Sequence, residues 1–128
     1  MYGNINTMKL SEMNPASLQK IFQMQCEICK SLGHPIRLQI VDLLNEGETS
    51  AAELLEILDT SKGNLSKHMS LLIHSGIVEF RRQGRQIFYS LTDPEIHKAC
   101  AIMRSILYRR LKQGGKLALA IQSAKAKQ

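Results

Sequence analysis

Three cysteines are the residues of this sequence best suited to covalent or metal chemistry. Cys26 and Cys29 are three positions apart, which places both thiols on one face of a helix. Cys100 lies much later, on the apolar stripe of the last long helix that the pattern predicts. Thiolates bind soft, thiophilic species, and two thiols form a disulfide when they are oxidised. The alternative interpretation is that all three are small core residues, which is a frequent role of free cysteine.

A second group of side chains has the hydrogen-bonding chemistry of nucleic-acid recognition. These residues fall on the outward face of a predicted helix over residues 61–75 and on a predicted hairpin over residues 77–91. The candidates are Lys62, Gly63, Asn64, Ser66, Lys67 and His68 on the helix, and Arg81, Arg82, Gly84 and Arg85 on the hairpin. Asn64 has the amide geometry that reads adenine, and the cations suit guanine or phosphates. The alternative is the polar, solvated face of an ordinary helix.

Charge is distributed unevenly along the 128 residues, whose formal net charge is +6. Residues 1–60 have four basic and eight acidic side chains, a net charge of −4. Residues 61–92 have five basic and one acidic (net +4), and residues 93–128 have eight basic and two acidic (net +6). A basic excess of this kind indicates a polyanionic partner. We expect the middle region on DNA, and the C-terminal region to add non-specific attraction.

Apolar periodicity and capping signals predict the secondary structure. The predicted elements are helices over residues 15–32, 35–44, 51–58, 61–75 and 93–113, and strands over 77–81 and 87–91. Ser50, Ser61 and Asp93 are expected to cap the helices that follow them. A short connection containing Gly84 joins the strands. Residues 116–128 are expected to form a weak helix or to be disordered.

This order of elements predicts a mainly α-helical fold with a β-hairpin wing, a winged helix-turn-helix of order α-α-α-α-β-β-α. We divide the chain into a flexible N-terminal arm (1–13), a winged helix-turn-helix domain (14–113) and a basic C-terminal tail (114–128). The sequence has no apolar run of the roughly 18 residues that span a membrane and no secretory signal, so we expect a cytoplasmic protein without a membrane partner. It has no nucleophile–base pair or phosphate loop that predicts an enzyme.

Several short segments, in their order and spacing, resemble the ArsR/SmtB family of bacterial repressors. The segments are 32–40 (LGHPIRLQI), 47–48 (GE), 66–72 (SKHMSLL), 75–78 (SGIV), 82–85 (RQGR) and 89–91 (YSL). The resemblance covers about residues 26–110. It implies a cytoplasmic homodimer built from the first and last helices, which binds an inverted-repeat operator in double-stranded DNA. It also implies that an effector releases the operator.

The best-known sensor sites of this family are missing at the matching positions. Arsenic sensors have a Cys-x-Cys after the Gly-Glu pair, where this chain has Ser50 and Ala52. Persulfide sensors pair two cysteines at places that look like Asp42 and Tyr108. The places of the zinc ligands on the last helix are occupied by Asp93, Glu95, Ile106 and Arg109. Isoleucine and arginine do not ligate zinc.

If the first and last helices pack together, as the resemblance implies, Cys26, Cys29 and Cys100 converge within one chain or across the dimer. Three thiolates suit As(III) or Sb(III), or Cd, Pb or Zn with a fourth ligand. Lys30 and Lys98 are near enough in sequence to favour the thiolate forms. We therefore favour a repressor that a soft metal(loid) such as arsenite releases. Two alternatives stay open: a redox or reactive-sulfur response of a cysteine pair, and an effector-free module that acts through a protein partner.

Overall fold

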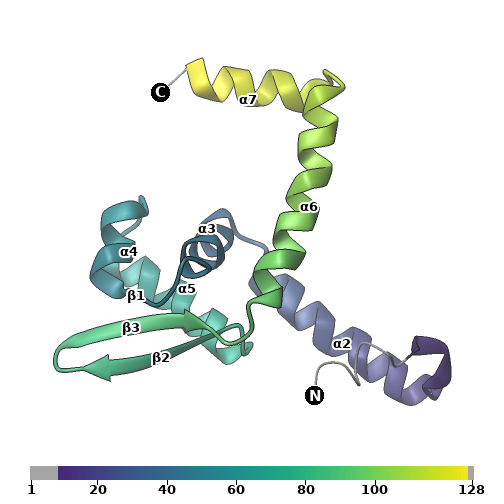
Figure 1. The fold of residues 1–128 in the computed structure, drawn as a ribbon, viewed down its shortest axis with the longest axis horizontal. Coiled ribbons are helices and arrows are strands. Elements are labelled where there is room, and N and C mark those ends of the chain that lie inside the picture. Colours follow the sequence, from purple (N-terminus) through teal and green to yellow (C-terminus); the bar gives the residue numbers. More distant parts are fainter. Residues whose placement is uncertain (1–8, 127–128) are drawn as a thin grey trace.

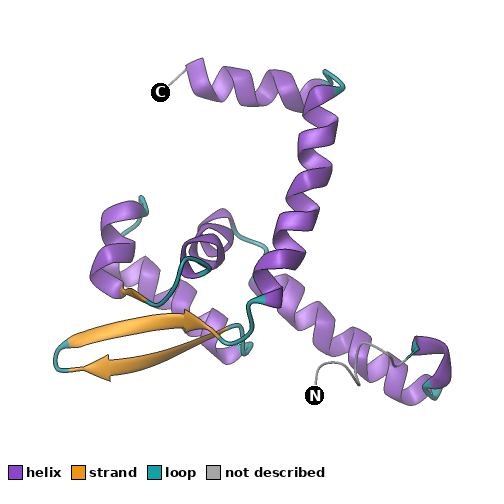
Figure 2. Ribbon diagram, in the orientation of Figure 1, coloured by secondary structure: helices purple, strands orange, loops and turns teal. Residues whose placement is uncertain are grey.

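The computed structural model describes residues 9–126, so residues 1–8 of the predicted arm and the last two residues of the predicted tail lie outside the described residues. The elements are a short 3-10 helix η1 (Leu10–Glu12), α2 (Pro15–Ser31), α3 (Pro35–Leu44), β1 (Thr49–Ser50), α4 (Ala51–Ile57), α5 (Lys62–His74), β2 (Val78–Gln83), β3 (Gln86–Leu91), α6 (Glu95–Lys112) and α7 (Lys116–Ala126). The α4–α5 pair followed by the β2–β3 hairpin confirms the predicted winged helix-turn-helix (Figures 1 and 2).

Side-chain caps fix the helix starts that surround the hairpin and the helix pair. The Ser50 hydroxyl accepts a hydrogen bond from the backbone N–H of Glu53 at 3.1 Å, which begins α4. The Ser61 hydroxyl likewise accepts from the N–H of Asn64 at 3.1 Å and begins α5. A carboxylate oxygen of Asp93 accepts from the N–H of Glu95 at 2.9 Å. The first two bonds satisfy backbone donors that the first helical turn leaves free, so the predicted caps Ser50 and Ser61 are confirmed. The prediction for Asp93 is wrong: the N-cap of α6 is Pro94, which makes no side-chain cap bond, and Asp93 lies one residue before it.

The hydrophobic core lies between α3, α4, α5 and the start of the hairpin. Its buried residues are Ile40, Val41, Leu44, Leu54, Leu58, Leu65, Met69, Leu72, Ile77, Val78 and Tyr89. Those on the helices follow the apolar spacing that the sequence shows. Burial of each large aliphatic side chain contributes about 2 kcal/mol. This core therefore holds α5 and the hairpin in a fixed relation to each other.

The sheet has three antiparallel strands in the order β1-β3-β2, one more than the sequence predicts. The extra strand, β1, pairs Thr49 with Tyr89 and is too short to show an alternating pattern. The hairpin strands extend beyond the predicted bounds until Gln83 pairs with Gln86. Gly84 has a φ of +63° in the two-residue turn, a backbone conformation that glycine adopts without steric cost.

The long helices α2 and α6 extend away from the core (Figure 1). Neither has a buried residue. Phe22 on α2 is 50% exposed and Met103 on α6 is 69% exposed, although both lie on the predicted apolar stripes. The α7 helix follows α6 and shows that residues 116–126 adopt the helical alternative. Among residues 9–126, no helix is both long and apolar enough to cross a membrane.

Candidate DNA interface and thiol site

The α5 helix presents its polar candidates on one side and its core residues on the other. Leu65, Met69 and Leu72 are buried, which turns the remaining face of the helix outward. The exposed candidates on it are Lys62, Gly63, Asn64, Ser66 and Lys67. They occupy its first two turns, so the N-terminal half of α5 is a hydrogen-bonding surface open to a ligand.

The hairpin brings a second set of cations to the same surface. Lys62 at the start of α5 and Arg85 in the hairpin turn line one cavity of about 280 Å³, together with Gln86 at the start of β3. Arg82 and Gly84 are exposed beside this turn. Two cations from elements 23 positions apart thus share one hollow, which is a favourable place for a phosphate. We call the surface of Lys62, Asn64, Arg82 and Arg85 the DNA-reading surface.

Arg81 differs from the other cations of the hairpin because its guanidinium is already paired. Its Nε and Nη2 donate to the two carboxylate oxygens of Glu48 at 2.8 and 2.7 Å. The same guanidinium lies 4.5 Å above the centre of the Phe88 ring. The hydrogen bond from Arg81 lowers the pKa of the Glu48 carboxyl. Arg81 therefore braces the hairpin against the loop before β1.

His68 lies apart from the exposed candidates of α5. Its imidazole is half-buried and its ring centre is 4.5 Å from that of His34. Its Nδ1 accepts a hydrogen bond from Nε of Arg37 at 3.2 Å. Burial, followed by the charges of His34 and Arg37, lowers the pKa of His68. The sequence predicts His68 on the outward face with the phosphate-binding candidates. It gives no sign of the contact with Arg37, because the two residues are 31 positions apart.

Two of the three cysteines meet in an apolar cavity between α2 and α6. Cys29 and Cys100 line a space of about 360 Å³ whose other walls include Leu38, Met103 and Leu107. Cys26 and Cys29 are both exposed and Cys100 is half-buried, but Cys26 does not line this cavity. Within one chain, therefore, two of the three cysteines line one cavity.

The surroundings of Cys100 favour its neutral thiol. Burial raises the pKa of Cys100, and the nearby Cys29 raises it further, while Arg104 acts in the opposite direction. The expectation that Lys30 and Lys98 favour the thiolates is not met at Cys100. Both ammonium groups face carboxylates of their own helices, Lys30 with Glu27 at 3.9 Å and Lys98 with Glu95 at 2.9 Å.

A three-ligand metal site is not formed by the described part of a single chain. Among residues 9–126, no group of three or more His, Cys, Asp or Glu side chains is close enough together to hold a metal ion. The three thiols therefore do not gather at one point within the described part of a single chain, and their convergence across a dimer stays a prediction. Cys26 lies one helical turn before Cys29 on α2 and does not reach the cavity that Cys29 lines with Cys100.

Comparisons with known proteins match this geometry to one class of regulator. The profile of a helix-turn-helix domain matches residues 32–80. The HTH-type transcriptional regulator Rv0081 of Mycobacterium tuberculosis H37Rv is 34% identical over 94 residues, which cover 73% of this chain and 82% of the relative. Its crystal structure superposes with a TM-score of 0.65 at 32% identity, covering 79% of this chain and 97% of that one.

Two further relatives have more specific names. The biofilm growth-associated repressor of Xylella fastidiosa Temecula1 is 33% identical over 113 residues, or 88% of this chain and 99% of the relative. A homolog of the cadmium resistance regulatory protein CadC from Staphylococcus aureus is 28% identical over 102 residues, or 79% and 77% of the two chains. The chain belongs to the ArsR/SmtB family. It is a transcriptional regulator of winged helix-turn-helix fold with β2–β3 as the wing. We refer to α5, the second helix of the helix-turn-helix, as the recognition helix.

The residue at one of the compared sensor positions, Asp42, takes part in an ionic cluster. Asp42, at the place where persulfide sensors have a cysteine, contacts Nε2 of His97 at 2.9 Å and Nη1 of Arg104 at 3.3 Å. The hydrogen bond with His97, and then that with Arg104, lowers the pKa of Asp42. This cluster joins α3 to α6, and sequence reasoning missed it because His97 is 55 positions from Asp42.

Proposed function

We propose that this regulator is a cytoplasmic homodimeric repressor that binds an inverted-repeat operator and releases it when a thiophilic effector reacts with its cysteines. The observation that carries the DNA-binding part is the cavity shared by Lys62 and Arg85. The cavity joins the start of α5 to the turn of the wing, and this supports a model in which one phosphate contacts both cations.

The exposed apolar faces of α2 and α6 support the homodimer. Ile102 and Met103 on α6 are 66% and 69% exposed, and Met24 on α2 is 59% exposed. Large apolar side chains gathered on two helices favour burial against a second protein surface. A second copy that covers these faces pairs two recognition helices, and a two-fold pair of helices fits an inverted repeat.

The Cys29–Cys100 pair supports a thiol-based response. Arsenous acid loses one water for each thiol that it binds, so its reaction with the two thiols of this largely apolar cavity yields a neutral adduct. Cys26 would supply the third sulfur of a trigonal As(III) or Sb(III) site if α2 shifts or if the partner protomer supplies it. The Staphylococcus relative named for cadmium resistance is consistent with a soft metal ion as effector.

A second candidate is an oxidant, because the cavity of Cys29 and Cys100 lacks a third ligand. Two thiols joined as a disulfide lose two protons and two electrons, which an oxidant such as diamide accepts to become the hydrazine. This chemistry needs only the pair that the cavity contains. The two kinds of effector therefore differ in whether release of the DNA requires Cys26.

The test begins with DNA selected by the wild-type protein from a random duplex library. Fluorescence anisotropy then follows release of the selected duplex by sodium arsenite, cadmium chloride or diamide. We expect Cys29→Ser and Cys100→Ser to abolish release by the true effector. Loss of release in Cys26→Ser as well indicates three-sulfur binding, and its retention indicates the pair. An undiminished response in all three variants would rule out the thiol site, and failure to enrich any duplex would rule out DNA binding.

A further inference from the structure

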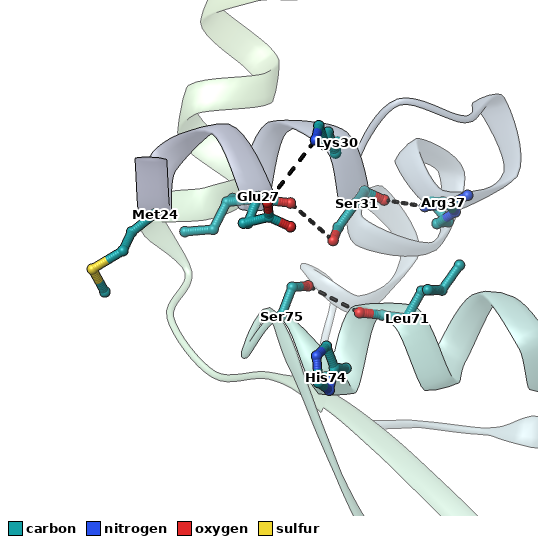
Figure 3. Close-up of a pocket in the computed structure, with 9 residues that line it drawn as sticks. Met24, Glu27, Lys30, Ser31, Arg37, Leu71, His74 and Ser75 are labelled. Atoms are coloured by element: carbon teal, nitrogen blue, oxygen red, sulfur yellow. Dashed lines mark hydrogen bonds and ion pairs between the residues drawn. The ribbon is translucent and has the colours of Figure 1, made fainter. Parts of the chain in front are cut away.

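The Arg37 guanidinium, at the first turn of α3, contacts two other helices. Its Nη1 donates to the backbone carbonyl of Ser31, the last residue of α2, at 2.8 Å (Figure 3). Its Nε donates to Nδ1 of His68 in the middle of α5 at 3.2 Å. One planar cation thus connects the end of the helix that has Cys26 and Cys29 to the recognition helix.

This connection is distinctive because α2 has few other polar links to the body. Among residues 9–126, the bond from Arg37 is the one side-chain hydrogen bond that joins α2 to another element. Glu27, Lys30 and His74 line the same pocket between α2 and α5, but Lys30 pairs only with Glu27 on its own helix (Figure 3). Besides the apolar contacts of Ile28 and Leu32 with the core, Arg37 is therefore the polar contact through which a shift of the α2 end acts on the body.

The link requires a neutral His68. A ring nitrogen accepts a hydrogen bond only when it has no proton, so the bond from Arg37 fixes the proton of His68 on Nε2. The titratable and charged groups that act on this ring are His34, whose Nδ1 accepts from the backbone N–H of Ile36, and Arg37 itself. Both lie at the start of α3, and Lys67 on the same helix as His68 is exposed. Burial and the positive charge of Arg37 keep the pKa of His68 below its ordinary value.

We propose that Arg37 is a positioning residue for DNA reading, which holds the recognition helix to the end of α2 through neutral His68, and that protonation of His68 releases this hold. The proposal rests on the operator binding proposed above and adds its regulation. Protonation removes the acceptor and places a cation beside Arg37, so the contact becomes repulsive. Reaction of the thiols on α2 reaches α5 through the same guanidinium.

The test measures affinity for the selected duplex at pH 7.5 and pH 5.5 in four proteins: the wild type, Arg37→Gln, His68→Asn and Lys30→Gln. Asparagine retains an oxygen acceptor near the place of Nδ1 but does not titrate. Lys30→Gln is the matched control, since it removes the same charge from the same pocket without breaking the link. We expect the wild type and Lys30→Gln to lose affinity on acidification, by up to about three- to tenfold as His68 becomes protonated, the equivalent of one hydrogen bond.

We expect Arg37→Gln to lose about the same factor already at pH 7.5 and to show less than about twofold further change at pH 5.5. His68→Asn should bind like the wild type at pH 7.5 and show the same flat response to acid. An Arg37→Gln variant with the wild-type pH profile and a salt slope reduced by about one would overturn the proposal, because it would show a direct phosphate contact. A pH profile of His68→Asn identical to that of the wild type would overturn it too, whereas absence of DNA binding by the wild type would refute the proposed function instead.

Discussion

The DNA-reading surface and the cysteine cavity differ in how much of each a single chain completes. Lys62, Asn64, Arg82 and Arg85 stand on α5 and the wing, whose opposite faces are fixed by the buried core. Cys29 and Cys100 stand on α2 and α6, which have no buried residue. The proposed DNA-reading surface is therefore preformed in one chain, whereas the cysteine cavity depends on how the two long helices α2 and α6 are held together.

The largest expected effect comes from charging the uncovered face of α6. We expect Ile102→Lys to convert the dimer to a monomer, because the lysine would be buried without a partner charge at the interface. Operator affinity should then fall by about a hundredfold, since two linked recognition helices bind far more tightly than one. Light scattering and anisotropy measure the two effects. Ile57→Lys is the matched control, because Ile57 is 62% exposed on α4; a monomer in both variants, or in neither, would contradict the assignment of the α6 face.

A smaller effect is expected from the cations of the preformed surface. Removal of Arg82 and Arg85 together should weaken binding about tenfold at 0.15 M salt and reduce the slope of log K against log salt by about two. The dimer should be unaffected, since neither residue lies on α2 or α6. Lys112→Ala, at the end of α6, is the control for a general loss of positive charge. An equal change of slope in the control would mean that the wing is not a specific part of the interface.

The alkylation rates of the cysteines test how well α2 and α6 cover the cysteine cavity. Because burial raises the pKa of Cys100, we expect iodoacetamide at pH 7.5 to alkylate it about three- to tenfold more slowly than the exposed Cys26. Mass spectrometry of timed samples gives both rates in one experiment. In urea the two rates should become equal. Equal rates in the folded protein would show that α2 and α6 leave Cys100 open.

The smallest expected effect tests whether the wing is rigid by itself. Gly84→Ala should destabilise the fold by about 1 kcal/mol, because Gly84 has a φ of +63° that an alanine side chain disfavours. Gly63→Ala, within α5 and with open space around an added methyl group, should instead stabilise it by about 0.5–1 kcal/mol. Urea unfolding followed by circular dichroism measures both. A Gly84→Ala variant as stable as the wild type would indicate a mobile wing turn.

Most of the preformed region follows from local signals in the sequence. Ser50 and Ser61 mark helix starts because a short hydroxyl satisfies a free backbone N–H. The change from helical to alternating periodicity marks the hairpin, and Gly84 marks its turn. The strand β1 is not predicted, because two residues are too few to show the alternating pattern of a strand.

The cysteine site and the link to His68 follow less well from sequence. Helical spacing places Cys26 and Cys29 on one face, but it does not determine which of them meets Cys100. Similarly, the polar side chain of His68 predicts a phosphate contact, but in the structure its imidazole contacts Arg37 and His34. In both cases the deciding contact joins residues that are dozens of positions apart.

By itself, the sequence determined the order of the elements, the serine caps of α4 and α5, and the wing, because these depend on neighbours within about four positions. It also supplied the exposed cations of the proposed DNA-reading surface. Only the tertiary structure decided that Cys29 rather than Cys26 shares a cavity with Cys100. It also decided that Arg81 is paired with Glu48 and that Arg37 connects α2 to α5. Those contacts depend on the angles at which helices and strands pack. The packing of the whole core sets these angles, and no local sequence pattern encodes them.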